Sequence, residues 1–90
     1  MQFEWDAAKA AANVHKHGVS FDEASTVFAD NLSATGRDLD HSRDESRFMT
    51  FGLSNKGRVL AVSHTDRGGM VRIVSARAAT RKEKQIYEES

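Results

Sequence analysis

The feature of this 90-residue chain that most constrains its fold is the stretch at residues 47–77. Its sequence is RFMTFGLSNKGRVLAVSHTDRGGMVRIVSAR. Val, Ile, Phe and Thr, which favour β-structure, fill three segments, and turn residues separate these segments. Glycine in each turn supplies the positive φ that tight connections need. The pattern predicts an antiparallel meander with strands at about residues 47–54, 58–65 and 70–77.

Basic side chains lie in or beside these otherwise apolar strands: Arg47, Arg58, His64, Arg67, Arg72 and Arg77. Side chains alternate between the two faces of a strand, so the loop lengths decide which of them share a face. A four-residue second loop places Arg58 opposite Arg77 and His64 opposite Val71. A four-residue first loop then places Arg47 opposite His64, on the same face. A three-residue first loop would move the strand that begins at Arg47 to the opposite face.

The segment before the meander predicts two helices. Asp6 is suited to cap an alanine-rich helix over residues 7–16, and Gly18 is suited to end it. Ser20 begins a Ser-x-x-Glu capping box that opens a second helix to about residue 29.

The ends of the chain complete the fold prediction. Residues 2–5 alternate apolar and polar side chains, which predicts an edge strand or an arm. Residues 30–46 lose periodicity and predict a loop, whereas a capping box at Thr80 opens a C-terminal helix to about residue 89. We therefore expect one α+β domain spanning residues 1–90. It would contain a small antiparallel sheet, two N-terminal helices and one C-terminal helix.

Composition excludes several classes of protein. The chain has no cysteine, which excludes disulfide scaffolds and thiolate metal sites and fits a reducing compartment. Its N-terminus has no long apolar run, so we expect no signal peptide, no membrane span and a cytoplasmic location. His15 and His17 are two residues apart and do not share a helix face, so no metal site and no cofactor are expected.

Charge is balanced overall but not along the chain. The formal net charge is zero. Residues 1–45 hold four Lys/Arg against nine Asp/Glu, a net of −5, and residues 46–90 hold nine against four, a net of +5. This asymmetry indicates a basic surface suited to a phosphate backbone, unless charges of the two halves interleave on folding.

The basic residues of the meander suit metal-free cleavage of RNA, which needs a base, an acid and cations for the phosphorane charge. Arginine fits the last role because its planar fork meets two phosphate oxygens. His64 is a candidate acid or base, Glu45 a candidate base or orienter, and Tyr87 a candidate proton donor or stacking group. Each also has a purely structural interpretation, as a surface ion pair, a strand filler or a helix packing residue.

The order of residues along nearly the whole chain resembles the BrnT family, the toxins of type II toxin–antitoxin systems. The matching positions are Trp5-Asp6, Lys9, Asn13, Lys16-His17-Gly18, Phe21, Ala24, Phe28, Asp30, Glu45-x-Arg47, Gly52, Val62, Thr65-x-Arg67, Ile73-x-Ser75-Ala76-Arg77, Ala79, Glu83 and Tyr87. The resemblance implies a RelE-like ribonuclease fold, metal-independent RNA cleavage and growth arrest through blocked translation. It also implies a cognate antitoxin, BrnA, that neutralises the toxin and binds operator DNA together with it.

The expected site combines the resemblance with the chemistry. The resemblance implies catalytic roles for Glu45, Arg47, Arg67, Arg77 and Tyr87, and RNA contacts for Lys16 and His17. His64 matches no fixed position of the family, so its catalytic role rests on chemistry alone. Arg58 and Arg72 are expected to contact RNA because they are cations of the same strands.

Two other functions stay open at this point. The first is a non-catalytic binding module, a toxin-derived scaffold that docks a protein partner, which the balanced net charge favours. The second is a DNA-binding regulator, because residues 7–29 superficially resemble a helix-turn-helix. Its second helix would carry Asp22 and Glu23 and no Lys or Arg, a poor face for a phosphate backbone. RNA sequence preference, ribosome dependence and oligomeric state do not follow from the sequence.

Overall fold

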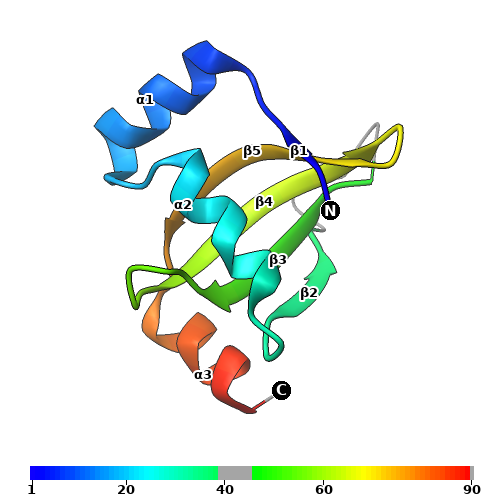
Figure 1. Ribbon diagram of the computed structural model, residues 1–90. Coiled ribbons are helices and arrows are strands. Elements are labelled where there is room, and N and C mark those ends of the chain that lie inside the picture. Colours follow the sequence, from blue (N-terminus) through cyan, green and yellow to red (C-terminus); the bar gives the residue numbers. More distant parts are fainter. Residues whose placement is uncertain (39–45, 90) are drawn as a thin grey trace.

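The computed structural model describes residues 1–38 and 46–89 and shows helices on both faces of a twisted sheet (Figure 1). The elements in chain order are β1 (Phe3–Glu4), α1 (Ala7–His17), α2 (Phe21–Ser25), the 3₁₀ helix η1 (Thr26–Ala29), β2 (Ala34–Arg37), β3 (Phe48–Leu53), β4 (Val59–Arg67), β5 (Met70–Ala78) and α3 (Arg81–Glu89). The predicted α+β class with three helices is confirmed.

The sheet has five strands in the order β1-β5-β4-β3-β2. β1 pairs with β5 in parallel, as the edge strand that residues 2–5 predicted, and the other pairs are antiparallel. The prediction of a three-stranded sheet is wrong, because β2 lies in the expected loop and pairs with β3. β2 has only four residues, Ala-Thr-Gly-Arg, so it carries no apolar alternation that a sequence pattern could reveal.

The hairpin between β4 and β5 is tighter than predicted. Its loop is Gly68-Gly69 alone, with φ of 57° and 82°. Two successive positive φ values give a two-residue turn whose twist matches that of the flanking strands. Thr65 therefore pairs with Arg72, and the predicted four-residue loop is wrong.

The register of β5 shifts once along β4. Ser63 pairs with Ser75 but His64 pairs with Ile73, so β5 has an extra residue at Val74, a β-bulge. Beyond the bulge Arg77 pairs with Ala61, not with Arg58 as predicted.

The first hairpin decides which face the start of β3 presents. Leu53 pairs with Val59, so five residues connect β3 and β4. This odd number has the same effect as the three-residue loop considered from the sequence. Phe48, rather than Arg47, therefore opposes His64.

The core lies between one face of the sheet and the layer of α1, α2 and η1. Its buried apolar residues are Val19, Phe21, Ala24, Val27, Leu60, Val62, Val71, Ile73 and Ala76. η1 approaches β3 closely at Gly52, where a Cβ atom would lie 3.0 Å from the Cβ of Val27. A side chain at Gly52 would push η1 away from the sheet.

Helix starts follow the predicted caps. The Asp6 carboxylate accepts hydrogen bonds from the amides of Ala8 and Lys9, and the Ser20 hydroxyl accepts one from the amide of Glu23. α2 ends at Ser25, and η1 continues to the predicted limit. None of the helices in the described part of the chain is long and apolar enough to cross a membrane.

Candidate functional site

The two faces of the sheet separate the basic residues that the sequence placed together. By register, Arg58 and His64 lie on the helix-covered face with Leu60 and Val62. Arg47, Arg72 and Arg77 lie on the opposite face, which we call the open face. The prediction that Arg47, Arg58, His64 and Arg77 share one face is therefore wrong. The five-residue connection and the bulge at Val74 are the physical reasons.

Arg77 of the open face binds a carboxylate through both of its terminal nitrogens. Its Nη1 and Nη2 donate to Oε1 and Oε2 of Glu83 at 2.7 and 3.0 Å. The bidentate pair raises the pKa of Arg77 and lowers the pKa of Glu83. Glu83 Oε1 also accepts the amide of Thr80 at 2.9 Å, which completes the predicted capping box of α3. The Glu83 carboxylate therefore caps α3 and binds Arg77 at the same time.

Hydroxyl residues lie between the arginines of the open face. Register places Thr65 beside Arg72 and Ser63 beside Ser75. Arg72 forms an ion pair of 2.6 Å with Glu4, which joins β5 to β1. Asp38 donates its amide to the carbonyl of Arg47 at 2.7 Å, which extends the pairing of β2 with β3. The arginines of the open face thus surround small hydroxyls, of which Ser63 and Thr65 are buried.

Other predicted residues lie farther from Arg77. By register Arg67 lies on the open face opposite Met70, exposed beside the Gly68-Gly69 turn at the other end of β4 and β5 from Arg77. Lys16 and His17 are exposed in the last turn of α1, on the layer that covers the other face (Figure 1). Glu45 lies outside the described residues.

Arg58 binds a carboxylate of α2. Its Nη2 and Nε donate to Oε1 and Oε2 of Glu23 at 2.6 and 3.0 Å, and Nη2 also donates to the carbonyl of Gly18 at 3.1 Å. Glu23 is buried, and its hydrogen bond from Arg58 is the main cause of its lowered pKa. Ser54 donates to the same carboxylate at 2.7 Å. This arrangement fastens the connection between α1 and α2 to the β3–β4 turn, so the contacts of Arg58 are structural.

His64 is buried within the helix-covered face. Its Nε2 lies 2.7 Å from the Thr50 hydroxyl, which lies 2.7 Å from the Thr35 hydroxyl. Its ring stacks on Phe48 and meets Phe28 edge-on. Burial lowers the pKa of His64, although Asp66 acts in the opposite direction. The geometry does not bring this imidazole together with Arg47 and Arg77, and its catalytic role stays a prediction.

Tyr87 binds Asp30 at the far end of α3. Its hydroxyl donates to Oδ2 of Asp30 at 2.6 Å, and this carboxylate also accepts the amides of Leu53 and Leu32 at 2.8 and 3.0 Å. The pair raises the pKa of Tyr87 and lowers that of Asp30. Asp30 and Glu83 both belong to the matched family pattern, but their contacts need spatial neighbours that the sequence does not reveal.

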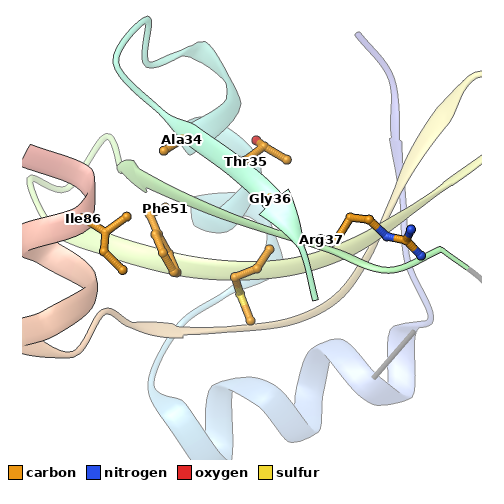
Figure 2. A pocket seen from close by; sticks show the side chains of 7 residues that line it. Ala34, Thr35, Gly36, Arg37, Phe51 and Ile86 are labelled. Atoms are coloured by element: carbon orange, nitrogen blue, oxygen red, sulfur yellow. The ribbon is translucent and has the colours of Figure 1, made fainter. Parts of the chain in front are cut away.

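A hollow of about 230 Å³ adjoins the open face between β2, β3 and α3. It is lined by Ala34, Thr35, Gly36, Arg37, Met49, Phe51 and Ile86. Figure 2 shows Ile86 of α3 beside Phe51, whereas the head group of Arg37 points away from them. Within the described residues, no group of three or more His, Asp or Glu could hold a metal ion.

Comparison with known proteins identifies the family. A family model described as "Ribonuclease toxin, BrnT, of type II toxin-antitoxin system" matches residues 5–83. The chain belongs to the BrnT family of ribonuclease toxins. Membership of this family implies an RNA target and an antitoxin partner.

A solved structure supports the BrnT fold. The crystal structure of the Brucella abortus ribonuclease toxin BrnT superimposes with a TM-score of 0.70 at 23% sequence identity. The match covers 90% of this chain and 99% of the Brucella chain. No curated protein matches the chain. The resemblance to BrnT toxins is confirmed, whereas the roles of individual site residues stay predictions.

Proposed function

We propose that this BrnT-family protein is a cytoplasmic, metal-independent endoribonuclease whose site lies on the open face around Arg47, Arg67 and Arg77. The family match over residues 5–83 carries the proposal. Its cleavage of RNA would arrest translation and growth. A BrnA-like antitoxin would neutralise it and bind operator DNA with it. A RelE-like fold is part of the same proposal.

The chemistry would use cations and a proton donor rather than a metal. The ribose 2′-hydroxyl attacks the adjacent phosphorus, and the guanidinium groups stabilise the charge that develops on the phosphate oxygens. Glu45, which precedes Arg47 by two residues, is the proposed base. Tyr87, whose hydroxyl donates to Asp30 in the structure, is the proposed acid.

Several of the predicted site residues take no part in the proposed reaction. Arg58 and His64 would support the fold, because Arg58 binds Glu23 of α2 and His64 packs against Phe28 and Phe48. Lys16 and His17 lie on a different surface from the open face, so contacts of these two with RNA would require a long substrate. Arg72 is the open-face cation expected to hold RNA without taking part in the reaction.

Purified protein tests the proposal. We expect it to cleave RNA in the presence of EDTA and to leave a 2′,3′-cyclic phosphate, because attack by the 2′-hydroxyl forms a cyclic product. A parallel titration with Mg²⁺ serves as the control. Cleavage that appears only after a divalent metal is added would contradict metal independence.

A non-catalytic binding module is the second candidate, favoured by one observation. Arg58, Arg72 and Arg77 each bind a carboxylate of the same chain, as arginines of a structural scaffold do. Induced expression separates the two functions. Growth arrest with rapid loss of RNA supports the toxin, and normal growth supports the scaffold. A DNA-binding regulator is disfavoured, because α2 spans only Phe21–Ser25 and offers no recognition helix.

A further inference from the structure

α3 rests on the sheet through contacts near its two ends. None of its nine residues is buried. Glu83 in its first turn binds Arg77, and Tyr87, four residues later, binds Asp30. Residues four apart share a helix face, so both contacts come from the side of α3 that faces the sheet. Figure 1 shows α3 at the end of the molecule away from the β4–β5 turn.

The contact at Arg77 has the geometry of anion recognition. Both terminal nitrogens of the guanidinium point at one carboxylate, at 2.7 and 3.0 Å. A phosphodiester offers the same fork two oxygens with a similar spacing and charge. Glu83 therefore occupies the position that an RNA phosphate needs if Arg77 is part of the site.

We propose that Glu83 is an intramolecular competitor of the RNA phosphate at Arg77. This inference rests on the proposed function, because it assigns a regulator to the same site. RNA binds when Arg77 exchanges the carboxylate for a phosphodiester, and the start of α3 is released from the sheet. While the Glu83 carboxylate occupies the guanidinium of Arg77, an RNA that makes no further contacts with the protein binds more weakly.

The surroundings of the pair permit this exchange. The side chain of Arg77 is 37% exposed and that of Glu83 is 18% exposed, so solvent and a polyanion reach the pair from outside. Water and salt screen a partly exposed ion pair, so an RNA phosphate competes with the carboxylate for the same guanidinium. Glu83 loses only Arg77 in the exchange, because it keeps its capping contact with the amide of Thr80.

Glu83→Gln separates competition from capping. Glutamine has the same shape, and its carbonyl oxygen still accepts the amide of Thr80, since Ser/Thr-x-x-Gln caps helices as Ser/Thr-x-x-Glu does. The substitution removes the negative charge that holds Arg77. Glu89→Gln is the matched control, because it removes the same charge from an exposed position of the same helix.

The probe is a short RNA oligonucleotide whose ribose 2′-oxygens are methylated, so the attacking hydroxyl is blocked and only binding is measured. We expect Glu83→Gln to bind it about two- to fivefold more tightly than Glu89→Gln, the effect of removing an ion pair of this exposure. The gain should vanish when Arg77→Ala is added to both variants. No gain, or an equal gain without Arg77, would overturn the proposal.

Wild-type protein gives an independent measurement. Hydrogen exchange of the Lys84 amide, which donates to the carbonyl of Thr80 at 2.9 Å, should become faster when the probe binds, because the tether at Arg77 opens. Unchanged or slower exchange would also overturn the proposal. Neither test depends on cleavage, so failure of the EDTA experiment would remove metal independence from the proposed function and leave this competition standing.

Discussion

Arg77 shows how one residue takes part in both folding and the proposed chemistry. On the strand it faces away from the core, opposite Ala61, so packing does not require an arginine there. Its ion pair with Glu83 is partly exposed and is expected to contribute only about 0.2–1 kcal/mol to stability. A cation placed where the core does not need it is better explained by binding.

We predict that Arg77→Ala abolishes toxicity and leaves the fold intact. Loss of a charged contact to the developing phosphorane lowers the cleavage rate by about 10²–10³, which corresponds to roughly 2–4 kcal/mol. Growth after induction at matched expression, with circular dichroism of the purified variant, measures both effects. Arg77→Lys keeps the positive charge but lacks the two parallel N–H donors of the guanidinium. Its toxicity should lie between those of the wild type and Arg77→Ala. Full toxicity of Arg77→Ala would remove this residue from the site.

His64 predicts a dependence of stability on pH. Burial holds its folded-state pKa below the ordinary value of 6.5, so the unfolded chain binds the proton more readily. The stability that depends on the neutral imidazole is fully present above the pKa of His64 in the unfolded chain. It is lost as the pH falls below that value. Lowered carboxyl pKa values, as at Glu23 and Asp30, add a second loss at more acidic pH.

We therefore expect the free energy of unfolding to decrease between about pH 7 and pH 5, before the carboxylates titrate. Urea titrations across this interval measure it. His64→Gln is the comparison, because glutamine can still hydrogen-bond Thr50 but does not titrate. If the wild type and the variant change equally with pH, His64 is not the responsible group.

At the scale of elements, local signals predicted the helices and the three central strands, because caps, turns and β-propensity act over a few residues. Asp6, Ser20 and Thr80 cap the helices as predicted. The pairing of β2 could not be predicted from four small or polar residues, because it depends on β3.

The candidate site was harder to predict than the elements. The basic strand residues were identified, but their distribution between two faces depends on loop length and on the bulge at Val74. A shift by a single residue moves a side chain to the other face. Sequence alone therefore grouped His64 with Arg77, although the sheet separates them.

Asn13 fastens one element to another. From α1 its amide nitrogen donates to the carbonyls of Val19 and Ala76, each at 2.8 Å, and its oxygen accepts the amide of Ala76 at 3.1 Å. We expect Asn13→Ala to lower the free energy of unfolding by about 1–3 kcal/mol, because buried backbone groups lose their partners. Chemical denaturation measures the loss, with exposed Asn31→Ala as the control. A decrease as small as that of Asn31→Ala would show that water replaces the amide.

At the scale of the whole molecule, folding partly cancels the charge asymmetry of the sequence. Glu23 of the acidic half binds Arg58 of the basic half, and Glu4 binds Arg72. Interleaving of the two halves, one of the alternatives left open by the sequence, therefore takes place at these pairs. The open face nevertheless gathers Arg47, Arg67, Arg72 and Arg77, although Glu4 and Glu83 bind two of them.

These arginines predict how the antitoxin binds. We expect acidic side chains of the antitoxin to meet Arg47, Arg67 and Arg77 and thereby to exclude RNA. Apolar contacts at half-buried strand residues such as Met49 supply most of the affinity. Complementary charge speeds encounter, so association should be faster at low salt, whereas the apolar contacts keep the complex assembled at high salt. Stopped-flow mixing with a BrnA-like antitoxin measures the rates, and hydrogen exchange maps the covered surface. Protection confined to α1 and α2, with the open face still exchanging freely, would mean that the antitoxin inhibits without covering the arginines.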